Sequence, residues 1–153
     1  MKLAEALILR ADCQKRIEQL KARLLRTARV QEGEEPSENP QNLLGELERV
    51  SGELVDLIKR INKTNSTTAF DAGQSIADAL AERDVLVLRR GAYSDLATTA
   101  AMRHDRITRS EVKFMSTVNV AETQKQADEL AKNYRELDAR IQELNWNTEL
   151  LNS

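Results

Sequence analysis

The sequence predicts an all-α protein, an elongated four-helix bundle or antiparallel coiled coil that forms a single domain over residues 1–153. Hydrophobic residues make up 41% and charged residues 31% of the chain, and aromatic residues only 3%, which is typical of long helices with aliphatic contacts. Apolar residues also recur three or four positions apart over four long segments, the spacing that lines one face of a helix. We therefore expect helices over about residues 2–31, 40–62, 76–102 and 120–150.

The first helix, residues 2–31, carries its apolar residues in one row, which consists of Leu3, Ala6, Cys13, Ile17, Leu20 and Leu24. Leu7, Ile8 and Leu9 add apolar surface in other directions, so we expect this end of the helix to be deeply packed. An acidic linker over residues 32–39 follows, and its glycine and proline cannot continue a helix.

The second helix, residues 40–62, begins with Asn39 as the expected N-cap and Pro40 in the first helical position. Its apolar residues follow a heptad spacing through Leu43, Leu47, Val50, Leu54, Leu57 and Ile61. Asn, Thr, Ser, Asp and Gly dominate residues 62–75. Because such side chains compete for backbone hydrogen bonds, we expect a loop there, with a short strand at residues 67–70.

The third helix, residues 76–102, contains four consecutive apolar residues, Val85, Leu86, Val87 and Leu88. Such a run points in every direction around a helix and can be hidden only at the centre of an assembly. We therefore expect burial on two sides and association of copies into an even-numbered homo-oligomer. Arg83, which lies between two acidic residues just before this run, is expected to form a buried ion pair across the bundle.

Between the third and fourth helices, residues 112–118 alternate in polarity as a half-buried strand does. This segment is expected to be extended and to pair with residues 67–70 as a two-stranded β ribbon at one end of the bundle. The last helix, residues 120–150, is expected to begin at Asn119 as its cap.

The residue types argue against an enzyme and against a metal or cofactor site. The one histidine, His104, stands among arginines and has no second metal ligand within reach along the chain. Cys13 lies far from it in the sequence, no Ser-His-Asp set is evident, and no glycine-rich phosphate loop is present. We therefore expect no catalytic residues, no metal and no cofactor.

The best candidates for ligand or partner contacts are basic residues between the last two helices. Arg103, Arg106, Arg109 and Lys113 could bind phosphates or carboxylates, or pair with nearby acidic residues of the chain. The formal net charge of −2 provides no overall attraction to nucleic acid or anionic lipid, so neither partner is expected. Trp146 could anchor a protein partner or cover the end of the bundle.

Several strings of residues resemble a family of small bacterial helical proteins of unknown function, some of whose members carry the name septicolysin, a pore-forming toxin. These strings are residues 1–7, 14–20, 31–36, 79–84, 116–118 and 138–143. The resemblance covers nearly the whole chain and implies a bacterial cytoplasmic protein, but no site residue can be transferred from it. A toxin would need a secretion signal or an apolar segment of about 20 residues, and the sequence contains neither pattern.

From the residues, we expect a non-enzymatic, cytoplasmic, homo-oligomeric helical protein that acts as a scaffold or protein-interaction module. The single cysteine excludes an intramolecular disulfide and suits a reducing compartment. The alternative is a nucleic-acid or phosphorylated-ligand binder that uses the arginine cluster, whose binding would weaken steeply as salt rises. A pore-forming toxin is the least favoured hypothesis.

Overall fold

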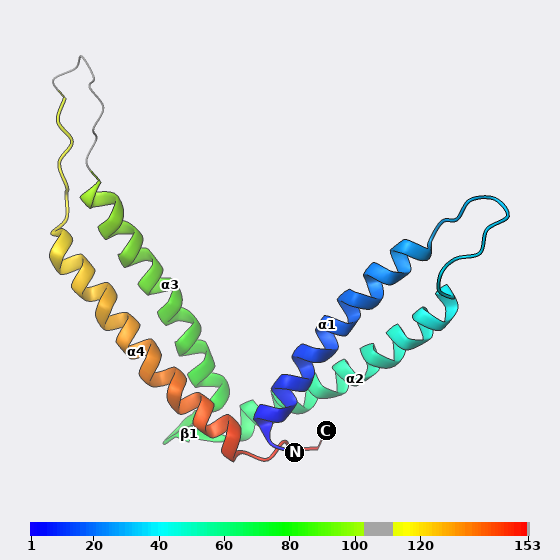
Figure 1. Cartoon of the computed structure of the whole chain (residues 1–153). Coiled ribbons are helices and arrows are strands. Elements are labelled where there is room, and N and C mark those ends of the chain that lie inside the picture. Colours follow the sequence, from blue (N-terminus) through cyan, green and yellow to red (C-terminus); the bar gives the residue numbers. More distant parts are fainter. Residues whose placement is uncertain (103–111, 153) are drawn as a thin grey trace. The chain divides into compact units, whose positions relative to one another are not determined.

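The computed structural model describes residues 1–102 and 112–152. These residues contain four helices and one small antiparallel sheet (Figure 1), in the order α1 (Leu3–Thr27), α2 (Pro40–Thr67), β1 (Ala69–Asp71), β2 (Gln74–Ser75), α3 (Ile76–Ala101) and α4 (Val120–Asn147). The prediction of an all-α helical bundle with a two-stranded ribbon is confirmed.

The chain divides into two compact units. The first contains Met1–Ile76 and Gln142–Ser153, and the second contains Ala77–Ile141. α4 crosses the boundary between them without a break, because it continues to Asn147. The first unit therefore contains α1, α2 and the end of α4, and the second contains α3 from Ala77 onward and the rest of α4.

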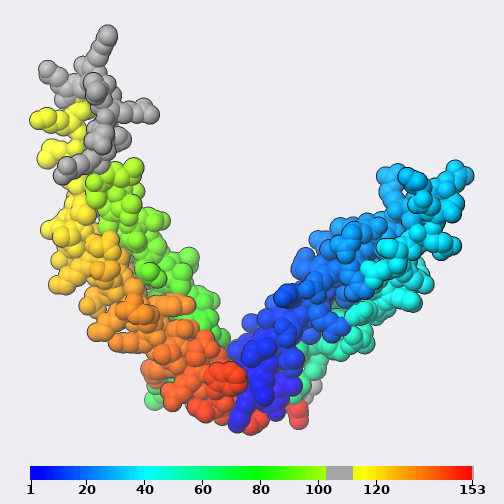
Figure 2. Space-filling model, viewed as in Figure 1, coloured from blue at the N-terminus to red at the C-terminus, as the bar shows by residue number. Residues whose placement is uncertain are grey.

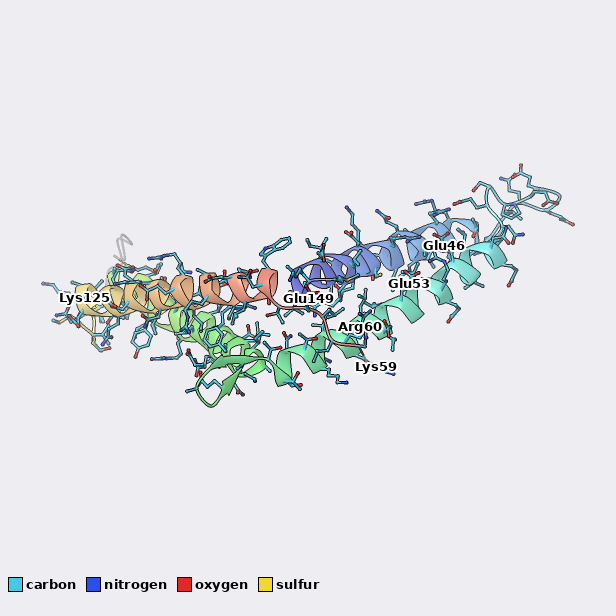
Figure 3. All side chains as sticks on the ribbon, turned by 90° about the horizontal axis from the view of Figure 1, so that it is seen from below. Glu46, Glu53, Lys59, Arg60, Lys125 and Glu149 are labelled. Atoms are coloured by element: carbon cyan, nitrogen blue, oxygen red, sulfur yellow. The ribbon has the colours of Figure 1, made fainter. Side chains whose placement is uncertain are left out.

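In the first unit α1 and α2 lie side by side (Figures 1 and 3). The heptad row predicted for α2 forms its buried face, since Leu43, Val50, Leu57 and Ile61 are all buried. Ion pairs flank this apolar contact. In one of them Arg16 Nη2 lies 2.7 Å from Oε1 of Glu46, which is labelled in Figure 3. The acidic linker is tied to α1, because the guanidinium of Arg23 donates three hydrogen bonds to the Glu38 carboxylate.

The first two helices end at other residues than the sequence indicates. α1 stops at Thr27 rather than 31, and Gly33, whose φ is 83°, turns the chain beyond it. α2 continues to Thr67 rather than 62. Its hydroxyl groups do not disrupt the helix, because they bond back to the preceding turn, as in Thr67 Oγ1 to Lys63 O at 2.8 Å.

The two strands form a hairpin that is local in sequence. β1 pairs with β2 in an antiparallel manner, and the turn between them contains Gly73 with a φ of 80°. The predicted pairing of residues 67–70 with residues 112–118 is therefore wrong, and residues 112–118 form no strand. A hairpin partner a few residues away costs less loop-closure entropy than one beyond a long helix.

A short bridge joins the two ends of the chain within the first unit. Lys2 pairs with Glu149 as an isolated antiparallel bridge, and Lys2 Nζ lies 2.5 Å from Glu149 Oε1. Two backbone hydrogen bonds of 2.9 Å flank the bridge, from Leu3 N to Thr148 O and from Leu150 N to Met1 O. These contacts explain why α4 ends at Asn147 rather than 150.

The segment after this bridge is held by α2. The fully buried hydroxyl of Thr64 accepts a hydrogen bond from Leu151 N at 3.0 Å and donates one to Arg60 O at 2.8 Å. Arg60 Nε then donates to Leu151 O, and Lys63 Nζ donates to Asn152 O. Arg60 and Glu149 are labelled in Figure 3. We call this set of contacts, together with the bridge, the terminal clasp.

In the second unit α3 and the first part of α4 lie side by side (Figures 1 and 2). The expected ion pair of Arg83 is present, because Arg83 Nη1 lies 2.9 Å from Asp138 Oδ1 on α4. The expectation that the pair is buried is wrong, because both side chains are partly exposed, at 24% and 31%. Asn119 caps α4 as predicted, since its Oδ1 accepts a hydrogen bond from Glu122 N at 3.0 Å.

Candidate interaction surface on α3 and α4

The apolar residues of α3 lie on more than one face of the helix, and only one face is covered by α4. Ala79 and Ala97 are buried. In contrast, Val85, Val87 and Leu88 are 51%, 50% and 72% exposed. The expectation that residues 85–88 are enclosed on two sides is therefore not met within this chain, because α4 covers one side only.

The exposed apolar residues of α3 form a row with coiled-coil spacing. We call this row the outer seam; its members are Ala81, Val85, Leu88, Ala92 and Leu96. Steps of four, three and four residues place the first four members along one stripe of the helix, and Leu96 lies at the edge of that stripe. All five are exposed, and the stripe is therefore available for a contact beyond this chain.

A groove of about 700 Å³ lies along one edge of the outer seam, between α3 and α4. Its apolar lining comes from Ala81, Val85, Leu86 and Leu137. Acidic and basic side chains line it in equal number, namely Glu82, Glu136, Arg89 and Arg140. Mixed charges of this kind can pair with a partner that also carries both signs.

Arg89 stands between this groove and a smaller one. The second groove has a volume of about 260 Å³ and includes Tyr93, Leu130 and Lys125, which is labelled in Figure 3. Arg89 is exposed and lines both grooves, so it is the basic side chain best placed to reach a partner lying along α3.

Two of the predicted site residues, Lys113 and Trp146, lie in the described part of the chain. Arg103, Arg106 and Arg109 lie outside the described residues, as does His104. Lys113 is described and is exposed.

Trp146 is 55% exposed on the last turn of α4. It belongs to the first unit, whereas Lys113 belongs to the second. Both residues remain predictions of partner contacts.

Two ion pairs of the first unit shift the pKa of their carboxylates. Hydrogen bonds from Arg23 lower the pKa of Glu38. Hydrogen bonds from the Lys2 side chain and from the N-terminal ammonium lower the pKa of Glu149. These carboxylates are stabilised in their charged form by structural contacts.

Among residues 1–102 and 112–152, no group of three or more His, Cys, Asp or Glu side chains could hold a metal ion. Over the same residues, no helix is long and apolar enough to cross a bilayer. Cys13 is buried as a free thiol in α1, in agreement with its expected place as a small core side chain.

The sequence predicted surplus apolar surface on α3 but not the outer seam itself. The run at residues 85–88 indicated surplus apolar surface, but a run of consecutive residues does not say which face a neighbour leaves open. The signal that could have found the seam is the spacing of Ala81, Val85, Leu88 and Ala92, once α4 is known to cover the opposite face.

Comparisons with known proteins agree with the fold and give no activity. Comparison with curated proteins found no match. The chain is similar to a functionally unknown conserved protein from Corynebacterium diphtheriae whose crystal structure has been solved, with 50% sequence identity, a TM-score of 0.94 and 99% coverage of both chains. The model of a family of unknown function, DUF6847, matches residues 10–150, and the chain therefore belongs to that family.

Proposed function

We propose that this protein is a non-enzymatic helical scaffold that associates with copies of itself through the outer seam of α3. The observation that carries the proposal is the exposure of that seam, in which Leu88 is 72% and Val85 is 51% exposed. Isolated exposed apolar residues are common on protein surfaces, but a continuous row at heptad spacing is typical of a helix that meets another helix.

The seam is also suited to association on energetic grounds. Complete burial of a valine or leucine side chain stabilises a contact by about 1.5–3 kcal/mol, and the seam contains three such residues. They project from a regular helix, so little backbone ordering opposes their burial. Ala81 and Ala92 are small, which lets a second helix approach closely at those levels.

The non-enzymatic part of the proposal rests on the residue types of the chain. The sequence has one histidine, His104, and one cysteine, Cys13, and the two lie far apart along the chain. The charged side chains at the α3–α4 groove are acids and arginines in equal number, a set suited to ion pairing with a protein surface. We place the scaffold in the cytoplasm, where the single thiol would stay reduced.

The direct test is the molar mass in solution over a range of concentrations. Size-exclusion chromatography with light scattering should give a mass above that of the 17.3 kDa chain at micromolar concentration, and the mass should fall on dilution. Replacement of Leu88 by Glu places a charge in the seam and should yield the monomer at concentrations where the unchanged protein is associated. A protein that is monomeric from nanomolar to tens of micromolar would rule out the proposal.

A further inference from the structure

We infer that the associated form is a two-fold dimer in which α3 packs against α3 of a second copy in the antiparallel direction, with the axis at the level between Leu86 and Val87. This inference rests on the proposed function, because it takes the occupant of the outer seam to be a second copy of the chain. It adds the direction and register of the contact and the charges that select them.

The register follows from the order of large and small residues in the seam. When α3 is reversed about that level, Val85 lies opposite the partner's Leu88, and Leu88 lies opposite the partner's Val85. In the same arrangement Ala81 lies opposite the partner's Ala92. Two large apolar pairs thus fill the centre and two small pairs flank it, as in an isologous contact between identical surfaces.

The direction follows from the charges along the two edges of the seam. Glu82 and Arg89 lie on the edge next to the α3–α4 groove, and Asp84 and Gly91 lie on the opposite edge. In antiparallel coiled coils like edges face each other, so Glu82 comes next to the partner's Arg89 at two symmetric places. A parallel pair would instead bring Arg89 next to the partner's Asp84.

The groove favours the antiparallel arrangement. When the two groove edges face each other, the partner's Arg89 approaches a rim that holds both Glu82 and Glu136. Asp84 then lies opposite the partner's Gly91 and meets no like charge there. The parallel arrangement would leave the two acidic residues of the groove without a cation from the partner.

Charge exchange tests the direction. Arg89→Glu should weaken dimerisation about tenfold, because each of two attractive contacts becomes repulsive. The double variant Glu82→Arg with Arg89→Glu should return the dissociation constant to within about threefold of the original, since the same pairs form with reversed signs. Arg90→Glu is the matched control, because it changes the net charge equally on the same helix but lies off the seam, and it should leave dimerisation unchanged.

The outcomes separate the two proposals. Recovery in Asp84→Arg with Arg89→Glu, but not in Glu82→Arg with Arg89→Glu, would show a parallel pair and overturn the register. A dimer that is insensitive to all of these charge changes would show that another surface is used. A protein that is monomeric throughout would instead refute the proposed function itself.

Cross-linking tests the register without any change of charge. In a Cys13→Ala background, a mixture of Ala81→Cys and Ala92→Cys chains should oxidise to the mixed disulfide, because these positions share a layer. Neither variant alone should cross-link well, since its two copies lie about 16 Å apart along the axis, eleven residues at about 1.5 Å each. Efficient cross-linking of Ala81→Cys with itself would contradict the inference, and circular dichroism would confirm that each variant keeps its helices.

Discussion

Replacement of Leu88 by Ala should weaken dimerisation strongly while leaving the fold of each chain almost unchanged. The leucine side chain is 72% exposed, so it contributes little to the stability of a single chain. Its truncation removes three carbon atoms, and each buried methylene contributes about 0.8 kcal/mol. Scaled by the exposed fraction, the loss is about 1.7 kcal/mol per copy and about 3.4 kcal/mol per dimer. This raises the dissociation constant about three-hundredfold.

Two measurements and one control check this expectation. Sedimentation equilibrium gives the dissociation constant, and urea unfolding below that constant gives the stability of the monomer, which should change by less than about 0.5 kcal/mol. Leu25→Ala is the matched control, because Leu25 is 68% exposed on α1 and does not belong to the outer seam. An unchanged dissociation constant for Leu88→Ala, or an equal effect of Leu25→Ala, would refute the reasoning.

The other predictions concern contacts inside the chain. Thr64→Val removes the hydroxyl that accepts a hydrogen bond from Leu151 N, and this N–H is then left without a partner. The free energy of unfolding should fall by about 1–3 kcal/mol in urea titrations. No loss would show that the terminal clasp contributes little to stability. Arg83→Met and Asp138→Asn should show a coupling free energy of about 1 kcal/mol in a double-mutant cycle, because the pair is partly exposed and lies between typical exposed and buried pairs. Additive effects would mean that the ion pair contributes nothing to stability. The lowered pKa of Glu149 stabilises the fold fully above the ordinary value of 4.5, and this contribution is lost as the pH falls through the lower, folded-state pKa. Thermal melts between neutral and acidic pH should therefore show a smaller acid-induced loss for Glu149→Gln, and an identical pH profile would contradict this assignment.

Helix-forming patterns in the sequence predicted most of the fold because they are local. Asn39 and Pro40 marked the start of α2, and Asn119 marked the start of α4, since a cap depends on only a few neighbouring residues. The ends were harder to place. The hydroxyls of α2 residues such as Thr67 can bond either to a loop or to the preceding turn, and composition alone does not decide between them.

The contacts that remained hidden are long-range. Nothing in the local sequence links Lys2 to Glu149, or Thr64 to the segment after α4, because these pairs are separated by most of the chain. The pairing of β1 was also missed, since alternation at residues 112–118 seemed a better strand signal than the two residues of β2. For the candidate surface, the sequence showed that α3 is too apolar for one neighbour, and only the position of α4 showed which face is left open.

The terminal clasp has a consequence for the order in which the chain acquires its structure during synthesis. The bridge joins Lys2 and Leu3 to residues that follow α4, whereas α3 and α4 are separated by one connection. Closure of the clasp must therefore overcome the entropy of joining distant ends, and it gains most if the intervening helices already shorten that distance. On emergence from the ribosome, the hairpin of α1 and α2 should form first, and the clasp should close only after α4 is complete.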